Sequence, residues 1–497
     1  MNRAAKLALL PAILLGLVVL GAAILRPARP EFSTSSREAY KLYLLGEERQ
    51  NAFQWLAAEE ALHKAVQLDP GFAAARALLA ASLAMRGQKE EAKREAQLAD
   101  SLALRLPRET ERLLVQLSLS EVMKKYGAER DSLLSLLEQR LPNHPTVVAA
   151  RAYSANMRGD AEAEEAAWRE LLRIDPNHAR AYNWLGYAAA RRGRYEEALS
   201  YLRRYAFLAP DLANPHDSLG EILVYKGDYE EAERELLQAL QIQPEFFYSL
   251  LSLARLYLEQ GRVEKGVGIL EQLRTELAGT GLVGHVEVAA FNLYTANALH
   301  DRLVPFARKV LAEKNGLDED TAAIFRAALA LHEGRAEESF ATVDDIAERL
   351  IKSGKAEDGS AARAALEARR HVFRAIAAER QDDASTSVAE WGRALASATR
   401  RAPHDLRWLQ LRYGEALLAY GDAHGSREQA QSILALNPRH PASLLLLARS
   451  EAALGDSNAA RAVLERLRAE LTKSDPDWPV RTAAEALRAK LGLAPAV

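Results

Sequence analysis

The sequence predicts an all-α solenoid, a row of helical hairpins, preceded by one apolar N-terminal helix. Three observations support this class. Landmark residues recur every 34 positions between residues 142 and 266. Within each unit, apolar residues recur at intervals of three and four, as they do on one face of a helix. No alternating apolar pattern of any length predicts a strand.

Length and composition narrow the possibilities further. The chain has 497 residues, more than one compact domain usually holds, so several domains or an elongated array are expected. Lys plus Arg total 65 and Asp plus Glu total 68, a balance that argues against a dedicated nucleic-acid binder. Cysteine is absent, which excludes disulfides, thiol catalysis, Cys-ligated metals and lipoprotein acylation.

The N-terminus carries an uncharged apolar run at residues 7–25. A helix of this length spans about 28 Å, close to the ~30 Å of a bilayer core. We therefore expect a signal-anchor or transmembrane helix over residues 1–26, placing the protein in the cytoplasmic (inner) membrane as a single-pass protein. The bulk of the chain is then expected on the periplasmic, extracytoplasmic side.

A cleaved signal peptide is the alternative, because residues 21–23 are small and suit a cleavage site. The protein would then be secreted. Residues 27–38 hold two prolines and a Ser/Thr run, which predicts a linker.

The 34-residue period is carried by four kinds of landmark. They are the pairs Leu185-Gly186, Leu219-Gly220 and Leu253-Ala254; the glycines Gly193, Gly227 and Gly261; the small residues Ala198, Ala232 and Gly266; and the prolines Pro142, Pro176, Pro210 and Pro244. A small residue lets two helices approach closely, a glycine ends the first helix, and a proline ends the unit. Each unit therefore predicts helix, turn, helix, turn.

This pattern resembles the tetratricopeptide repeat (TPR) family, whose best copy here runs from Ala179 to Leu212. The resemblance implies a right-handed superhelix of helical hairpins. We expect a TPR array of about seven repeats at 39–280, degenerate helical repeats at 281–372, TPR repeats at 373–474, and a capping helix and tail at 475–497. A long helix is expected at about 357–380.

Chemical motifs are few. Gly279–Gly284 matches G-x-G-x-x-G by letters, but it follows a helix, so an inter-helix loop is expected instead of a nucleotide site. His144, His178 and His440 fall at unit boundaries and are expected to be turn residues. The pairs Glu196-Glu197 and Glu230-Glu231 are expected to begin second helices, where negative charge suits the helix dipole. We therefore expect no catalytic residue, cofactor or metal, and no enzymatic activity.

The groove is the candidate site, because first helices line the concave face in the TPR family. Carrying those positions onto this chain gives Tyr153, Asn156, Arg180, Asn183, Tyr187, Arg191, Asn214, Asp217, Glu221, Tyr225, Tyr248 and Arg255. Tyr and Arg are favoured in interfaces. The alternative interpretation is that these residues are simply the polar faces of amphipathic helices.

The resemblance and the apolar run together predict a non-enzymatic interaction scaffold, tethered to a membrane, that binds a protein or peptide segment in this groove. A self-assembling structural solenoid is one alternative, and a TPR sensor module of a signalling system is another. A homo-oligomer stays open, and no nucleic acid is expected. The apolar first helices near Ala77 and Leu119 are a further place where an extended segment, or the N-terminal linker, could bind.

Overall fold

The computed structural model describes residues 31–51, 54–123, 128–280, 282–313, 317–354, 361–398 and 403–494. Within these ranges every regular element is a helix, so the predicted all-α class is confirmed for them. None of their helices is both long and apolar enough to cross a bilayer. The apolar run at residues 7–25 lies outside the described residues.

The described residues form two compact units. Apart from two three-residue segments, unit 1 ends at Arg140 and unit 2 begins at Leu141. The division falls inside the array that was predicted at 39–280.

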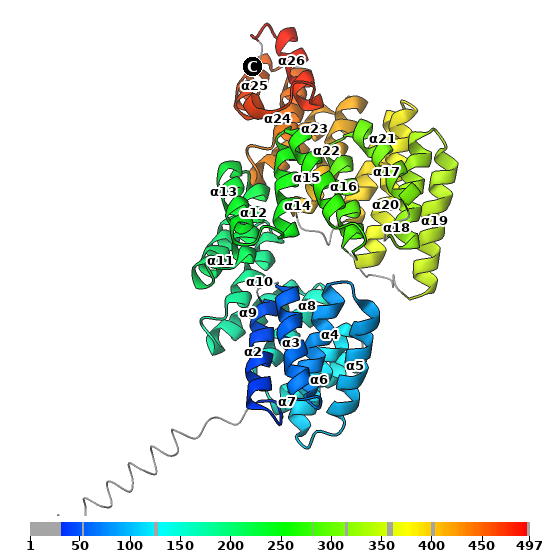
Figure 1. Ribbon diagram of the computed structural model, residues 1–497. Coiled ribbons are helices and arrows are strands. Elements are labelled where there is room, and N and C mark those ends of the chain that lie inside the picture. The colour runs from blue at the N-terminus through cyan, green and yellow to red at the C-terminus, as the bar shows by residue number, and fades with distance from the viewer. Residues whose placement is uncertain are drawn as a thin grey trace, which may run out of the picture. The chain divides into compact units, whose positions relative to one another are not determined.

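Unit 1 contains six helices among its described residues (Figure 1). They are α2 (Arg37–Asn51), α3 (Trp55–Leu68), α4 (Ala73–Met85), α5 (Lys89–Ala103), α6 (Glu109–Val122) and α7 (Ala128–Arg140). Their core is rich in alanine, with Leu62, Leu79 and Leu83 fully buried. Small side chains allow the helix axes to lie close together, which suits a hairpin stack.

The described part of the predicted linker is packed onto unit 1. Phe32 packs against the core, with its ring edge-to-face on Tyr43 at 5.5 Å between centroids. The Thr34 hydroxyl and the Ser35 N–H donate to one Asp69 oxygen at 2.6 and 2.7 Å. The linker is therefore a bound strap over residues 31–36 and not a free tether.

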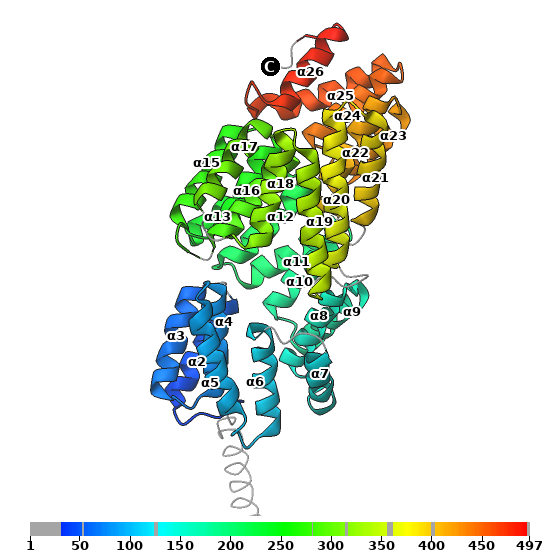
Figure 2. The same ribbon diagram turned by 90° about the vertical axis from the view of Figure 1, so that its right-hand side faces the viewer.

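Unit 2 continues the hairpins, and Figure 2 shows its helices following one another from α15 to α24. The helices are α8 (Pro145–Arg158), α9 (Ala161–Ile174), α10 (Ala179–Ala190), α11 (Tyr195–Leu208), α12 (Ala213–Lys226), α13 (Tyr229–Ile242), α14 (Phe247–Glu259), α15 (Val263–Glu276), α16 (Val283–Ala296), α17 (His300–Glu313), α18 (Glu319–His332), α19 (Ala336–Lys352), α20 (Ala361–Arg380), α21 (Ala384–Ser397), α22 (Pro403–Tyr420), α23 (Ala423–Leu436), α24 (Pro441–Ala453), α25 (Ser457–Glu470), the short η1 (Leu471–Lys473) and α26 (Pro479–Lys490).

The recurrent small residues have the role that the sequence predicted, which is close helix approach. A Cβ on Gly220 of α12 would lie 2.6 Å from Leu236 Cγ and 3.3 Å from the Ala232 carbonyl oxygen on α13. In the next hairpin the alanine is on the first helix and the glycine is on the second. Ala254 stands on α14 and Gly266 on α15, where a Cβ on Gly266 would lie 3.1 Å from the Ala254 carbonyl oxygen. In both hairpins the added Cβ would meet a leucine side chain and the partner's carbonyl oxygen, so glycine permits this close approach of the two helices.

His144, His178 and His440 lie in the turns before α8, α10 and α24, as predicted, and two of them also cap the helix that follows. His178 Nδ1 accepts from the Ala181 N–H at 3.2 Å, and His440 Nδ1 accepts from the Ser443 N–H at 3.3 Å. Glu196-Glu197 and Glu230-Glu231 lie in the first turns of α11 and α13. Such caps and charges satisfy backbone N–H groups at a helix start.

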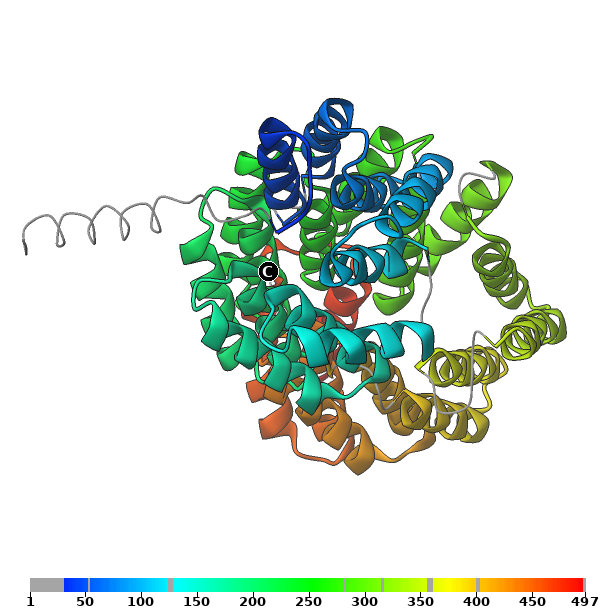
Figure 3. The ribbon, with the colours of Figure 1, turned by 90° about the horizontal axis from the view of Figure 1, so that it is seen from below.

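The C-terminal helices return to the middle of unit 2. Buried side chains of α14 and α15 share one core cluster with those of α22 to α26, among them Leu258, Leu270, Leu446 and Trp478. Figure 3 shows these C-terminal helices, coloured orange to red, beside the green helices of the same unit. Periodicity could not predict this packing, because each hairpin is specified only against its neighbours.

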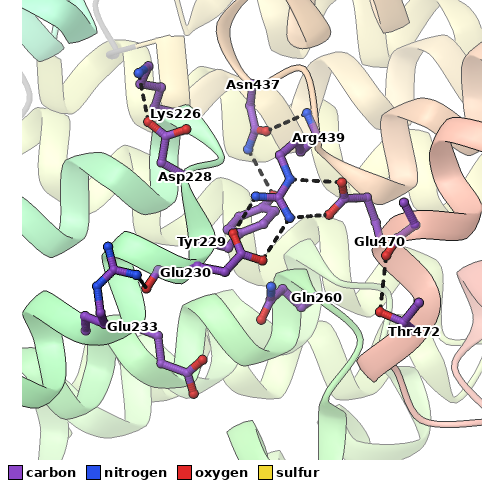
Figure 4. A network of polar contacts seen from close by, with 12 residues as sticks. Lys226, Asp228, Tyr229, Glu230, Glu233, Gln260, Asn437, Arg439, Glu470 and Thr472 are labelled. Atoms are coloured by element: carbon purple, nitrogen blue, oxygen red, sulfur yellow. Dashed lines mark hydrogen bonds and ion pairs between the residues drawn. The ribbon is translucent and has the colours of Figure 1, made fainter.

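Polar contacts also hold the C-terminal helices against the middle of unit 2 (Figure 4). Asn437 Nδ2 donates to the Tyr229 hydroxyl at 3.1 Å, and Arg439 bonds both Glu230 and Glu470. Farther along, the Asp475 N–H donates to the Gly261 carbonyl oxygen at 2.8 Å. Unit 2 is therefore an array whose C-terminal repeats are bonded to its own α13–α15 segment.

Candidate functional site

Unit 2 encloses a cavity of about 1000 Å³. Its lining residues belong to the first helices of seven successive hairpins, α10 to α22 by even numbers, together with His440 before α24. One wall, from α10, α12 and α14, is largely polar. The other wall, from α16, α18, α20 and α22, is largely apolar.

Eight of the twelve residues proposed from the sequence line this one cavity. They are Asn183, Tyr187, Arg191, Asn214, Asp217, Glu221, Tyr248 and Arg255. They fall on three helices, one helix per repeat, so residues 34 apart occupy equivalent positions. The structure thus brings together the polar side chains of α10, α12 and α14 as one surface.

The other four residues, Tyr153, Asn156, Arg180 and Tyr225, do not line the cavity. Tyr153 packs edge-to-face on Trp168 and Trp184, and the Arg180 guanidinium donates to its hydroxyl at 3.1 Å. Asn156 donates to Glu164 at 3.0 Å. Counting back 34 residues from Arg191 reaches Met157, so Asn156 is one residue out of the register.

Tyr225 is buried behind the wall and supports it. Its hydroxyl donates to Glu221 Oε1 at 2.6 Å and accepts from Arg255 Nη1 at 2.8 Å. The Arg407 guanidinium lies over its ring at 5.6 Å from the centroid. Tyr225 therefore joins the polar wall to α22.

The polar wall is tied together by hydrogen bonds between repeats. The Tyr187 hydroxyl donates to Glu221 Oε2 at 2.8 Å, and the Ser249 hydroxyl donates to Asp217 Oδ1 at 2.9 Å. Burial, and then the Glu221 carboxylate, raise the pKa of Tyr187 well above its ordinary value, so its proton stays on oxygen. These bonds link α10 to α12 and α12 to α14.

Two arginines of the lining are neutralised by carboxylates. Arg191 Nη2 lies 2.6 Å from each Glu164 oxygen, and Arg407 Nη2 donates to Glu259 Oε1 at 2.9 Å. The second pair joins α22 to α14 across 148 residues. Such pairs position groups more than they add net attraction.

Three acceptor groups of the polar wall have oxygen atoms without a hydrogen-bond donor in the part of the chain that the structure describes. Asn183 Oδ1 and Glu259 Oε2 are buried and have no hydrogen-bond partner among the described residues. Asp217 is 5% exposed, and burial, followed by the Glu221 charge, raises the pKa of its carboxyl to about 8. Buried acceptors without partners are rare in folded proteins. The wall is therefore prepared for hydrogen-bond donors.

The apolar wall was not predicted from the sequence. Its half-buried members include Val288, Phe291, Ile324 and Trp408. They fall where the 34-residue landmarks fade, so the period could not place them. Leu251 and Glu259 also line the cavity, and these two could have been found, because they lie 34 residues after Asp217 and Tyr225.

Side chains that could hold a metal ion are not grouped together in the described ranges, where no three His, Asp or Glu residues form such a cluster. The glycine-rich segment Gly279–Gly284 lies between α15 and α16, as predicted, although Gly281 is outside the described residues. Neither feature points to a metal or nucleotide site.

Comparison with known protein families finds matches over parts of the chain. A tetratricopeptide repeat model matches residues 223–280, and a second matches residues 158–213 and 411–476. No curated protein matches the chain. The matched segments include α10 and α14 of the polar wall, whereas most of α12 lies between two of them.

Among solved structures, a Thermobaculum terrenum O-GlcNAc transferase mutant is 25% identical over 27% of this chain and 26% of its own, with a TM-score of 0.25. This chain therefore spans about a quarter of that transferase chain. A chain of the Cut9–Hcn1 hetero-tetramer of APC/C is 13% identical to this chain, with a TM-score of 0.43. The match covers 92% of this chain and 84% of that one. The human IFIT1 dimer with PPP-AAAA is 16% identical over 88% and 95%, with a TM-score of 0.44.

Three observations agree with one another: the 34-residue landmarks, the helical hairpins that they form, and the two model matches. Together they support the tetratricopeptide repeat family for this chain.

Proposed function

We propose that this protein is a non-enzymatic scaffold that holds a segment of a protein partner in the cavity of unit 2. The observation that carries the proposal is the cavity itself, about 1000 Å³ and lined by seven successive first helices. Its polar wall offers unpaired acceptors, and its apolar wall offers side chains to bury. A peptide segment presents both backbone donors and apolar side chains, so it is suited to both walls.

We further propose that the scaffold is tethered to a membrane by residues 7–25, with the repeats on the extracytoplasmic side. The support is the uncharged run of nineteen residues in the sequence. The docked strap at residues 31–36 would then hold unit 1 close to the membrane surface. Secretion after cleavage near residues 21–23 is the alternative.

Self-assembly through the C-terminal end of the array has less support. A free end of a solenoid is a natural docking surface. Here α26 packs on α24 and α25, and Trp478 packs against Gly261 of the same chain. That face is therefore occupied within the protomer.

Site-specific photo-crosslinking in cells tests the proposal. A crosslinking amino acid at Ala289, half-buried on α16 in the cavity lining, should give a discrete heavier adduct with another protein. The same residue at Leu237, exposed on α13 and outside the lining, is the matched control and should not give that adduct.

A second arm tests the polar wall. The combined variant Asn183→Ala, Tyr187→Phe, Asp217→Asn and Glu221→Gln should lose the Ala289 adduct while keeping the helical circular dichroism spectrum and the melting temperature within a few degrees. An adduct that persists in this variant, or that appears equally from Leu237, contradicts binding in the cavity.

A further inference from the structure

Asp217 is a buried carboxyl that no lysine, arginine or histidine among the described residues neutralises. The titratable groups in electrostatic contact with it are Glu221 on its own helix, Tyr187 on α10, Tyr205 on α11 and Tyr248 on α14. All four are neutral or negative. The described residues place no lysine, arginine or histidine in an ion pair with it, and its one donor is the Ser249 hydroxyl.

Asn183 occupies the equivalent position one repeat earlier, and its side-chain oxygen has no donor among the described residues. It is 7% exposed, it lines the same cavity, and its Oδ1 atom has no partner among the described residues. Leaving a buried acceptor unpaired costs about 1–3 kcal/mol. Asp217, which has one donor for its two oxygens, stands at the same register of the next first helix, so a ligand that donates to both residues fits this part of the cavity.

The surroundings favour a positively charged donor. Trp184, Tyr187 and Tyr248 line the cavity together with Asn183 and Asp217, and aromatic faces attract ammonium groups. The cation at the end of α10, Arg191, is held by both oxygens of Glu164 and cannot also neutralise Asp217. A cation from outside the described residues could therefore pair with the ionised form of Asp217.

We propose that Asn183 and Asp217 form a subsite for a primary ammonium group borne on an apolar body, with the apolar part against α16 and α18. This rests on the proposed function, since it specifies the chemistry of what the cavity binds. The ammonium donates to Asn183 Oδ1 and to the free oxygen of Asp217. In a protein partner the group is a lysine side chain or an amino terminus.

Binding has a proton signature. Near neutral pH the free carboxyl of Asp217 is mostly protonated, because burial raises its pKa to about 8. An ammonium beside it stabilises the carboxylate. The carboxyl proton leaves to the buffer, the ammonium keeps its own, and one ion pair forms. Binding at pH 7 should therefore release close to one proton per site.

Calorimetric titration of the purified full chain tests the subsite without any knowledge of the partner. The probes are hexylammonium, hexanol and hexanoate, which share the apolar body. Hexylammonium should bind at least tenfold more tightly than either of the others. Repeating the titration in two buffers of different ionisation enthalpy should show the released proton.

Asp217→Asn is the decisive variant, because an amide replaces a carboxyl that is protonated at neutral pH and the fold should be kept. Hexylammonium affinity should fall at least tenfold and the proton release should vanish. Asp211→Asn, at an exposed turn residue before α12, makes the same side-chain change outside the cavity and should change neither quantity.

Two peptides then distinguish a lysine side chain from an amino terminus as the source of the ammonium group. Each has the sequence of the segment crosslinked to Ala289; one keeps its lysines and is acetylated at the amino terminus, and the other has norleucine for lysine and a free amino terminus. Tighter binding by the first assigns the subsite to a lysine, and by the second to an amino terminus.

Any of three results would overturn the subsite. They are hexanoate binding that is as tight as hexylammonium binding, no measurable binding of hexylammonium, and a hexylammonium affinity that is unchanged in Asp217→Asn. Each of these results leaves the Ala289 crosslink, and with it the proposed scaffold, standing. Conversely, hexylammonium binding without any protein adduct would retain the subsite and remove the protein partner.

Discussion

Arg439, in the turn before α24, donates to both carboxylate oxygens of Glu230, which lies 209 residues earlier at the start of α13. The two distances are 2.6 Å from Nη1 and 3.1 Å from Nη2. The same guanidinium donates to Glu470 at 2.9 Å and lies over the Tyr229 ring at 5.2 Å from its centroid. One side chain thus connects two distant turns and the end of α25.

The first prediction concerns this arginine. Arg439→Ala should destabilise the chain by about 2–3 kcal/mol, because it leaves the largely buried Glu470 carboxylate unpaired. Glu230→Gln should cost less, about 0.5–1 kcal/mol, because Glu230 is half exposed and water screens the pair. Urea unfolding followed by circular dichroism measures both. Glu231→Gln, beside it on α13 and paired only with exposed Arg203, is the control and should change the midpoint little.

The second prediction is the pH dependence of that pair. The Arg439 hydrogen bonds lower the pKa of Glu230 to about 2. A carboxyl whose pKa is lowered by folding adds stability above its unfolded pKa and loses it as pH falls through the folded value. The difference between wild type and Glu230→Gln should therefore be constant above about pH 5 and disappear between about pH 4.5 and 2. A difference that persists at pH 2 would contradict the ion pair.

The third prediction tests the C-terminal return through Gly261. Its φ is +74°, and an added Cβ would lie 2.1 Å from Trp478 Cε3. Gly455 has a similar φ of +86°, but open space around it. Both alanine variants should lose about 1 kcal/mol to the left-handed backbone. Gly261→Ala should lose a further ~1–3 kcal/mol because the indole must move.

A double-mutant cycle makes this prediction specific. In a Trp478→Ala background the extra cost of Gly261→Ala over Gly455→Ala should disappear, since no ring remains to displace. An equal cost in both backgrounds would show that the return does not depend on this contact. Thermal unfolding of the variants in the two backgrounds supplies the comparison.

The fourth prediction concerns the strap on unit 1. Asp69 accepts from Thr34 and Ser35, and these bonds hold its pKa below the ordinary value against the opposing effect of burial. Asp69→Ala should free residues 31–36 and raise the rate of chymotrypsin cleavage after Phe32 about tenfold, equivalent to losing ~1.4 kcal/mol.

Asp175 provides a matched control for the strap. It ends α9 as Asp69 ends α3, but its carboxylate accepts only from the Asn177 N–H of its own turn, at 3.1 Å. Asp175→Ala should leave the cleavage rate at Phe32 unchanged. If the two variants behave alike, the strap is not held by Asp69.

The fifth prediction is the effect of pH on stability through Asp217. Its pKa is raised by folding to about 8, so the folded chain binds a proton that the unfolded chain has released, and stability falls as pH rises from about 4 to about 8. Asp217→Asn removes this loss. The variant should be increasingly more stable than wild type over that range, by a few kcal/mol at the upper end, and constant above it. The free energy of unfolding of Asp211→Asn should differ from that of wild type by the same amount at every pH.

The period predicted much of the fold, and the reason is local. Gly220 and Gly266 each solve the same steric problem between the two helices of one hairpin, so the requirement repeats in the sequence. The polar wall followed from the same register, since Asn183 and Asp217 are 34 residues apart. Asn156 and Tyr153 lie outside the cavity because α8, their helix, contributes no residue to its lining.

The apolar wall could not be predicted. Ile324 and Trp408 lie in hairpins whose landmarks have faded, and their place in the same cavity as α12 depends on how every intervening hairpin is rotated. Small rotations add along a solenoid, so short-range patterns do not determine which distant helices meet.

The sequence by itself determined the helices, their pairing into hairpins and the side chains of the polar wall, because each depends on contacts within one or two repeats. Only the tertiary structure decided that the polar wall shares its cavity with an apolar one, that Arg439 reaches Glu230, and that Trp478 covers Gly261. The contacts that close the array join residues about 150 to 220 positions apart, and they form because its accumulated curvature brings its end back to its middle.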